Sequence, residues 1–322
     1  MKHLIITADD YGVFPAVNEG IIDAVNKDRV NSVAVLSNFK GSGSKYPDSL
    51  TNVHALLERT AEKNPEIGCH LTVTSGKPLT GSKMEFACDD NGNFFSFGNY
   101  RNYKEPEQLK LLFEELCAQV EELASVPGVT VKHLTNHHNA LTLFAHHFDV
   151  YLRVANKFRL PMRSADVRPK GKQSLYMFLL DRMLTGDVPK KDREDMMEFQ
   201  SRIAREFKRN SLGVKSTDFL ESSHYGPVGL LPAARLAKFW LVSDKHATLD
   251  AFFRQFLDSQ EQSVELLLHV AKPGWLTVDK SKDLDYAGVD RSYFDSRVLE
   301  YKSIIEYELE KWTGVQRRGW SF

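Results

Sequence analysis

Residues 3–12 read His-Leu-Ile-Ile-Thr-Ala-Asp-Asp-Tyr-Gly, and this short stretch indicates both a fold and a site. An apolar run that ends in a turn signal is typical of a buried parallel strand. Asp9 and Asp10 therefore stand at the carboxyl end of that strand, where α/β enzymes carry their chemistry. Two adjacent acids are unfavourable there unless a cation or a proton compensates them. The stretch predicts a metal or acid–base site; the alternative is a loop in which Asp10 caps the helix after Pro15.

Strand-like and helix-like segments alternate along the rest of the chain. Strands are expected at 32–36, 67–71, 131–136, 215–220 and 263–269, and helices at 16–28, 50–63, 106–125, 147–158, 175–184, 192–208, 247–257 and 293–312. This alternation predicts an α/β fold, a single (β/α) barrel-like domain over residues 1–322, irregular or incomplete, with a helical insertion around 171–212. A doubly wound open sheet is the alternative. Neither GxGxxG nor GxxxxGK[ST] occurs, so nucleotide-binding forms of that sheet lack support.

The composition narrows the classes of function. Lysine and arginine number 42 against 43 acidic residues, so no basic excess calls for nucleic acid. The 3 cysteines are widely spaced and without a CxxC pair, which argues against a disulfide framework or a thiolate zinc site. We find no signal peptide and no membrane-length apolar run, so we expect a cytoplasmic protein without a membrane partner. A homodimer is left open.

Polar residues stand where nearly every expected strand ends. In a barrel these ends meet on one face, within reach of a single ligand. His133 and His137 lie four residues apart, so they share a face and form a candidate metal pair. The bland alternative for each histidine is an ordinary, hydrogen-bonded loop residue. The strand-end residues are Asp9, Asp10, His70, His133, His137, Arg163, Asp218 and His269.

The remaining histidines and Cys69 are expected to be structural. His146 and His147 open a helix and are interpreted as a surface and capping pair, and His54 as a residue on an exposed helix face. His138 and Asn139 should point elsewhere than the candidate metal pair. Cys69 precedes His70 on a strand, so it should face the opposite side and pack against a helix.

One aspartate plus two histidines from different strands is a familiar ligand set for a hydrolytic divalent metal. It leaves coordination positions for water and substrate, and the neighbouring carboxylate is a plausible general base.

With these motifs the chain resembles the YdjC-like carbohydrate deacetylases, the group that contains the chitooligosaccharide deacetylases. The resemblance spans most of the chain, and its motifs occur in the family's order. They are Thr7–Gly12, Asn18–Ile22, Ile67–Thr72, Gly76–Leu79, His133–His138, Tyr225–Gly226, Glu265–His269 and Pro273–Gly274.

The resemblance implies a barrel-like fold and the removal of an acetyl group from an N-acetylated mono- or oligosaccharide. It implies one divalent metal ion, Mg²⁺ or Zn²⁺, held by Asp10, His70 and His137. Asp9 matches the general base. His269 matches a late histidine that serves as the acid for the leaving amine or stabilises the oxyanion. Arg163 either orients Asp9, binds substrate hydroxyls or forms a salt bridge at the barrel mouth.

The chain departs from the family pattern in its fourth motif. Thr135 replaces an aspartate and Asn136 a serine, and Ala140 and Leu141 stand in the stretch that would carry the last histidine of the motif. The lost acid would have fixed a ligand, so we expect Thr135 to point at His70, His133 or Asp10, or else to pack in the core. The alternative functions are hydrolysis of another ester or amide, such as a phosphoester, and non-catalytic sugar binding.

Overall fold

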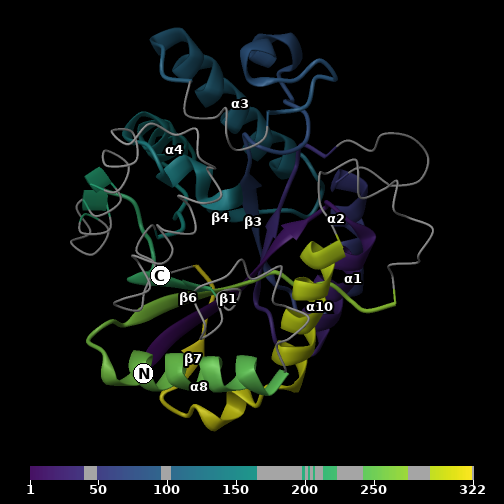
Figure 1. Cartoon of the computed structure of the whole chain (residues 1–322), viewed down its shortest axis with the longest axis vertical. Coiled ribbons are helices and arrows are strands. Elements are labelled where there is room, and N and C mark those ends of the chain that lie inside the picture. Colours follow the sequence, from purple (N-terminus) through teal and green to yellow (C-terminus); the bar gives the residue numbers. More distant parts are fainter. Residues whose placement is uncertain are drawn as a thin grey trace.

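A single parallel sheet forms the centre of the molecule (Figure 1). The computed structural model describes residues 1–39, 49–95, 103–164, 198–199, 202–203, 206, 213–222, 242–274 and 291–320. The strands follow the order β4-β3-β2-β1-β6-β5, every neighbouring pair is parallel, and β7 pairs with the start of β1. Their bounds are β1 Lys2–Tyr11, β2 Ser32–Val35, β3 Glu66–Leu71, β4 Val131–Asn136, β5 Phe219–Ser222, β6 Ser263–Leu268 and β7 Val315–Arg317.

The sheet curls toward an irregular barrel between its two outer strands. Leu134 in β4 forms a parallel bridge to Met162, and the Met162 amide donates to the carbonyl of Lys215 at 3.0 Å. Lys215 leads into β5, so these bonds carry the pairing from β4 across to the other edge. The expected barrel-like α/β domain is confirmed, and the open doubly wound sheet is not formed.

Helices cover the outside of the sheet (Figure 1). Proline in the first turn favours the start of α1 and of α3. A capping box between Glu105 and Gln108 also stabilises the start of α3. The helices are α1 Pro15–Asn26, α2 Ser49–Arg59, α3 Pro106–Ala124, α4 Ala145–Phe158, α8 Val242–Asp258 and α10 Arg291–Glu306. Short 3₁₀ helices are η1 Gly81–Ala87, η3 His137–Thr142 and η6 Leu309–Lys311.

Alternation along the strands sends one set of side chains into the barrel. Ser32 and His133 meet there at 3.2 Å, with Gly68 opposite. A Cβ on Gly68 would lie 2.2 Å from the His133 ring, so only glycine leaves room for that imidazole. Below it Trp320 stacks on the same ring with centroids 4.8 Å apart. We call His133, Ser32 and Trp320 the barrel floor.

Two local expectations fail, and so does the alternative interpretation of Asp10. The sequence predicted Asp218 at the carboxyl end of a strand. It instead lies before β5 and accepts hydrogen bonds from the backbone amides of Gln262 and Ser263. The strand starts later than predicted because its polar first half, from Lys215, is not part of the ladder. Asp10 does not cap α1, whose N-cap is Phe14.

Several predicted features lie wholly or mostly outside the described residues. They are the helices 175–184 and 192–208, the insertion 171–212 and Tyr225–Gly226.

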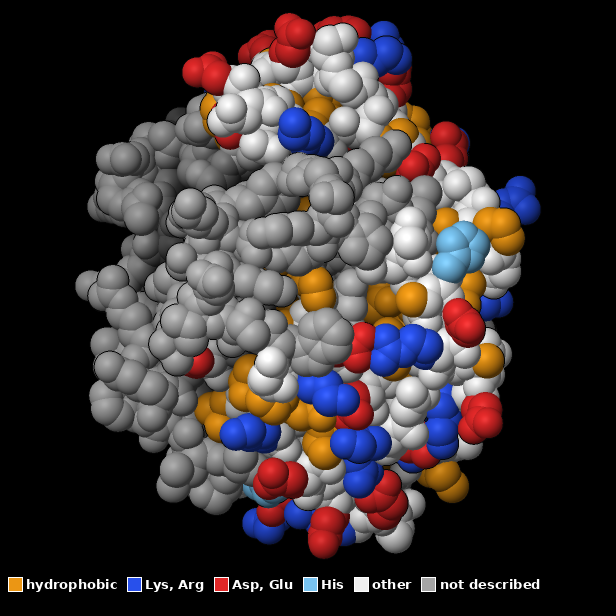
Figure 2. Space-filling view, turned by 90° about the vertical axis from the view of Figure 1, so that its right-hand side faces the viewer, with side chains coloured by type: hydrophobic (Ala, Val, Ile, Leu, Met, Phe, Trp, Pro, Cys, Tyr) orange, Lys and Arg blue, Asp and Glu red, His pale blue; other side chains and the backbone are white. Residues whose placement is uncertain are grey.

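Charges on the surface are mixed rather than segregated. Figure 2 shows a face on which basic and acidic side chains alternate over its described part. Described surface ion pairs include Arg29 with Glu310 and Lys63 with Asp28. None of the described helices is both long and apolar enough to cross a bilayer.

Candidate metal centre and its neighbours

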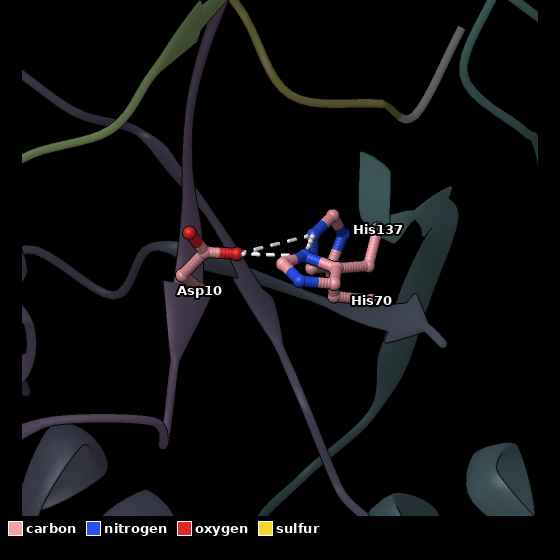
Figure 3. A group of neighbouring side chains, drawn as sticks. All are labelled: Asp10, His70 and His137. Atoms are coloured by element: carbon pink, nitrogen blue, oxygen red, sulfur yellow. Dashed lines mark hydrogen bonds and ion pairs between the residues drawn. The ribbon is translucent and has the colours of Figure 1, made fainter. Parts of the chain in front are cut away.

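Three side chains from three chain segments meet at the carboxyl end of the barrel (Figure 3). Asp10 comes from the end of β1, His70 from β3, and His137 begins η3 directly after β4. Asp10 Oδ1 lies 3.0 Å from His137 Nδ1 and 3.5 Å from His70 Nε2, and the two nitrogens are 3.3 Å apart. These are the three residues that the family resemblance assigns to the metal.

The backbone of β1 explains how neighbouring aspartates reach the same site. Strict alternation would point Asp10 away from the side that Asp9 faces. Asp10 instead has φ 69°, in the left-handed region, and the pairing with β2 shifts between Ala8 and Tyr11. A left-handed aspartate is strained by about 1–3 kcal/mol, and such strain clusters at functional sites. The bulge therefore turns both carboxylates toward the mouth.

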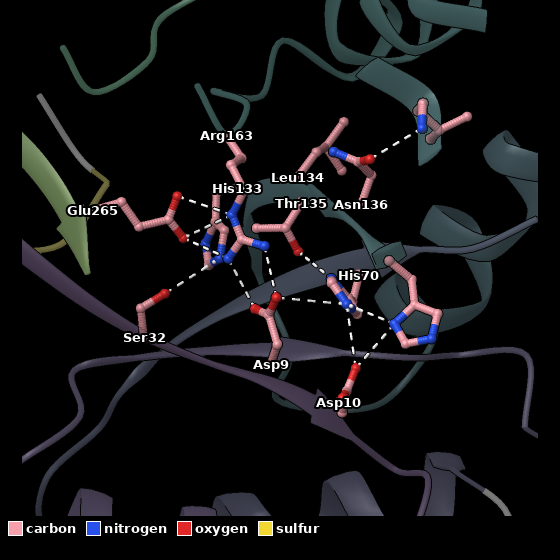
Figure 4. Close-up of polar contacts among 12 residues, drawn as sticks. Asp9, Asp10, Ser32, His70, His133, Leu134, Thr135, Asn136, Arg163 and Glu265 are labelled. Carbon is pink, nitrogen blue, oxygen red and sulfur yellow. Dashed lines mark hydrogen bonds and ion pairs between the residues drawn. The ribbon is translucent and has the colours of Figure 1, made fainter. Parts of the chain in front are cut away.

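The three side chains fit a divalent cation. Around a tetrahedral ion with bonds of about 2.1 Å, ligand atoms lie about 3.4 Å apart, close to the separations here. The Thr135 hydroxyl lies 2.6 Å from His70 Nδ1 (Figure 4), so a proton on Nδ1 leaves Nε2 facing the centre. The expectation that Thr135 points at a candidate ligand is confirmed.

Asp9 lies beside this centre but has a different partner. Arg163 Nη1 and Nη2 donate to its two oxygens at 2.6 and 2.8 Å. Burial raises the pKa of Asp9, but the charge and hydrogen bonds of Arg163, together with the charge of His70, bring the pKa below its usual value. Asp9 Oδ2 remains 3.6 Å from His70 Nε2. Asp9 is therefore an ionised carboxylate at the edge of the ligand triad.

Arg163 reaches the barrel interior because its backbone is fixed to β4. The Arg163 amide donates to the Leu134 carbonyl at 2.9 Å. Its guanidinium also contacts Glu265 of β6, with Nε to both oxygens at 3.1 and 3.0 Å and Nη2 at 2.6 Å (Figure 4). Arg163, Asp9 and Glu265 thus form a buried ion-pair cluster under the candidate metal centre.

A second arginine, from α10, contacts Asp10. Arg297 Nη2 donates to Asp10 Oδ2 at 2.8 Å, so Asp10 presents its other oxygen, Oδ1, to the histidines. Burial raises the pKa of Asp10, but His137, then His70 and Arg297, hold it well below its usual range. Three carboxylates (Asp9, Asp10, Glu265) face two arginines here, which leaves one net negative charge for a cation to balance.

Arg297 was missed from the sequence, and Glu265 was noted only as part of a motif. Arg297 sits in a polar stretch of α10 that looks like a solvated helix. The sequence offered only a weak signal that Glu265 has a role at the site: it is a lone charged residue inside the most apolar predicted strand, Val264–Leu268.

His269 follows β6 and is partly buried near the two aspartates. Burial, followed by the charge of Arg297, lowers its pKa to about 4, while Asp10 and Asp9 raise it. Its imidazole is thus neutral near pH 7 and can donate a hydrogen bond without carrying charge.

The histidines that were expected to pair for a metal lie in different layers. His133 is in the barrel floor, where burial and Arg163 lower its pKa to about 3. His138 is not one of the three grouped ligands: its ring centroid is 3.8 Å from that of His137, and its Nδ1 is 3.0 Å from the Thr74 hydroxyl.

The prediction of a surface pair at 146–147 is wrong for His147. This side chain is fully buried, with Nε2 2.8 Å from the Tyr103 carbonyl, because α4 packs this turn against the segment before α3. His54 is exposed on α2 and Cys69 is buried in the core, as expected.

The whole described fold and its site belong to a chain that matches a known protein family. The family described as YdjC-like protein matches residues 3–313. The chain belongs to this family.

Curated relatives match over a shorter region of this YdjC-like chain. The carbohydrate deacetylase of Thermoanaerobacter pseudethanolicus is 29% identical over 168 residues, 51% of this chain and 61% of that protein. The carbohydrate deacetylase of Oceanobacillus iheyensis is 31% identical over 163 residues, 50% of this chain and 64% of that protein. The matched region thus spans less than two thirds of either relative.

A solved structure supports the fold over its whole length. A crystal structure from Enterococcus faecalis V583, provisionally named a cellobiose-phosphate cleavage protein, superposes with a TM-score of 0.65. It covers 99% of this chain and 97% of that chain at 20% identity, which is evidence about the fold alone.

Proposed function

We propose that this YdjC-like protein is a metal-dependent hydrolase that removes an acetyl group from an N-acetylated mono- or oligosaccharide. The observation that carries the proposal is the meeting of Asp10, His70 and His137 at 3.0–3.5 Å beside Asp9, an ionised carboxylate. The names of the two carbohydrate deacetylases support the reaction type. Two imidazoles and one carboxylate favour Zn²⁺ over Mg²⁺, which prefers oxygen ligands.

The residues divide the work between them. A divalent cation held by Asp10, His70 and His137 would polarise the acetyl carbonyl and lower the pKa of a water molecule. Asp9 accepts the proton of that water, since each of its oxygens has lone pairs beyond those that Arg163 uses. Arg163 keeps the Asp9 carboxylate oriented at the edge of the triad. His269, neutral near pH 7, donates a hydrogen bond to the developing oxyanion or to the leaving amine.

The arginines do not favour the phosphoester alternative. Both described cations at the centre, Arg163 and Arg297, already form ion pairs with carboxylates. A phosphoester site would use such cations on the substrate.

The test is acetate release by the purified full chain. The protein is stripped with a chelator, reloaded with Zn²⁺ or Mg²⁺, and offered a panel of N-acetylated mono- and oligosaccharides together with sugar phosphates. We expect acetate release that disappears on stripping and returns with metal. Phosphate release instead of acetate would favour the phosphoesterase. Sugar binding without release of either product, in protein shown to hold metal, would contradict hydrolysis.

A further inference from the structure

Glu265 is a buried carboxylate that has no direct part in the proposed reaction. It lies in the middle of β6, fully buried, in register with Ile5 of β1. Asp9 lies four residues further along β1, about 13 Å at the usual strand rise. Glu265 therefore lies deeper in the barrel than the candidate centre, and Arg163 contacts both Glu265 and Asp9.

The contacts of Arg163 give its guanidinium a single orientation. Nη1 and Nη2 face Asp9, while Nε and Nη2 face Glu265 (Figure 4). A guanidinium is a rigid planar fork, so fixing its Nε edge also fixes the direction of its tip. With Glu265 absent, the tip could rotate and carry Asp9 with it.

Stability alone does not explain Glu265. Arg163 and Asp9 already neutralise each other, so Glu265 adds a buried negative charge whose desolvation is unfavourable. Buried ion-pair clusters of this kind are often no more stable than apolar replacements of similar volume. A role in geometry explains why a carboxylate is placed in an otherwise apolar strand.

We propose that Glu265 is a positioning residue: it holds Arg163 so that the Asp9 carboxylate stays aimed at the centre formed by Asp10, His70 and His137. This inference rests on the proposed function, because it assumes that Asp9 acts on a group bound at that centre. Glu265 thus supports the reaction from β6 without contacting the substrate.

The experiment compares Glu265→Gln with Glu115→Gln. Glu115 is a matched control, since it is also fully buried and accepts hydrogen bonds, in its case from Leu79, Thr80 and Gln119. For each protein we would measure bound metal, melting temperature, and kcat and KM for acetate release. Crystal structures of metal-loaded wild type and Glu265→Gln would report the orientation of Asp9.

We expect Glu265→Gln to keep its metal and its KM while kcat falls roughly 10–100-fold, the scale for a group misplaced by about 1 Å. Glu115→Gln should lower the melting temperature but keep kcat. Glu265→Asp keeps the charge and should retain part of the kcat that Glu265→Gln loses. If Glu265→Gln does not fold, Glu265→Asp is measured in its place, and we expect kcat to fall less than roughly 10–100-fold and the Asp9 carboxylate to be displaced.

An unchanged kcat, or a fall that only follows metal loss, would overturn the positioning role. If wild type releases no acetate, the proposed function fails by itself. The crystal structures then still decide the role of Glu265, because an Asp9 carboxylate that does not move in Glu265→Gln contradicts it.

Discussion

Two histidines of one chain segment, one within β4 and one just after it, lie in opposite surroundings. His137, just past the carboxyl end, joins Asp10 and His70 at the mouth. His133, four residues earlier, lies in the barrel floor between Ser32 and Trp320. Both side chains are buried, and they share a face in the sequence pattern. Depth along the barrel therefore decides the role of each histidine, since four strand residues correspond to about 13 Å.

The largest expected difference between His137 and His133 is in metal binding. We expect His137→Ala to lose stoichiometric Zn²⁺ and its turnover, because two remaining ligands hold a divalent ion poorly. His133→Phe should keep the metal, since it removes only a floor contact. Elemental analysis and acetate release measure both. Metal loss in His133→Phe at full folding would show that floor and mouth are not separate.

The next largest effect separates the two adjacent aspartates. Asp9→Asn should keep metal while turnover falls by roughly 10²–10⁴, the usual contribution of a general base. Asp10→Asn should weaken metal binding as well, since the amide loses the negative charge of the ligand. Isothermal titration with Zn²⁺ measures metal affinity, and steady-state kinetics measure turnover. Equal metal loss in both variants would mean that Asp9 is itself a ligand.

A smaller effect is expected at Thr135, which lies between floor and mouth on β4. Its hydroxyl contacts the ligand His70 at Nδ1. Thr135→Asp should change metal affinity by about 10–100-fold, because a carboxylate at Nδ1 fixes the ring and raises its basicity. Thr135→Ser keeps the hydroxyl and serves as the control. Titration of the apo proteins decides the point: unchanged affinity with a lower melting temperature would leave Thr135 only a packing role.

The smallest effect concerns acid stability of the floor. The folded pKa of His133 is about 3, whereas the unfolded value is about 6.5. Between these values the unfolded chain binds a proton that the folded chain does not, so stability falls as pH drops from 6.5 toward 3. His133→Phe should therefore lose part of this pH dependence, measured as unfolding free energy at pH 7 and pH 4.5. His54→Phe, on an exposed helix face, should keep the pH dependence of the wild-type unfolding free energy. If His133→Phe also keeps that pH dependence, His133 is not its source.

Sequence patterns located most of the local structure. The strand at 131–136 has the predicted bounds, and Pro106 with Gln108 marks the start of α3. These signals are local: an apolar period, a cap and a turn act within a few residues. Asp10, His70 and His137 followed from the motifs of the family resemblance rather than from spacing, which had paired His137 with His133.

Which polar residues lie at the same depth of the barrel depends on the packing of strands and helices that are distant in the sequence. The positions of Asp218 at an amino end, His133 in the floor and Arg297 beside Asp10 depend on strand register and on helix packing. Glu265 meets Arg163 across 102 residues of chain because the sheet curls and brings β6 opposite the bridge at Met162. Side-chain alternation gives the face on which a residue lies. The depth and the partner come from how separate strands are placed against one another, which no local pattern encodes.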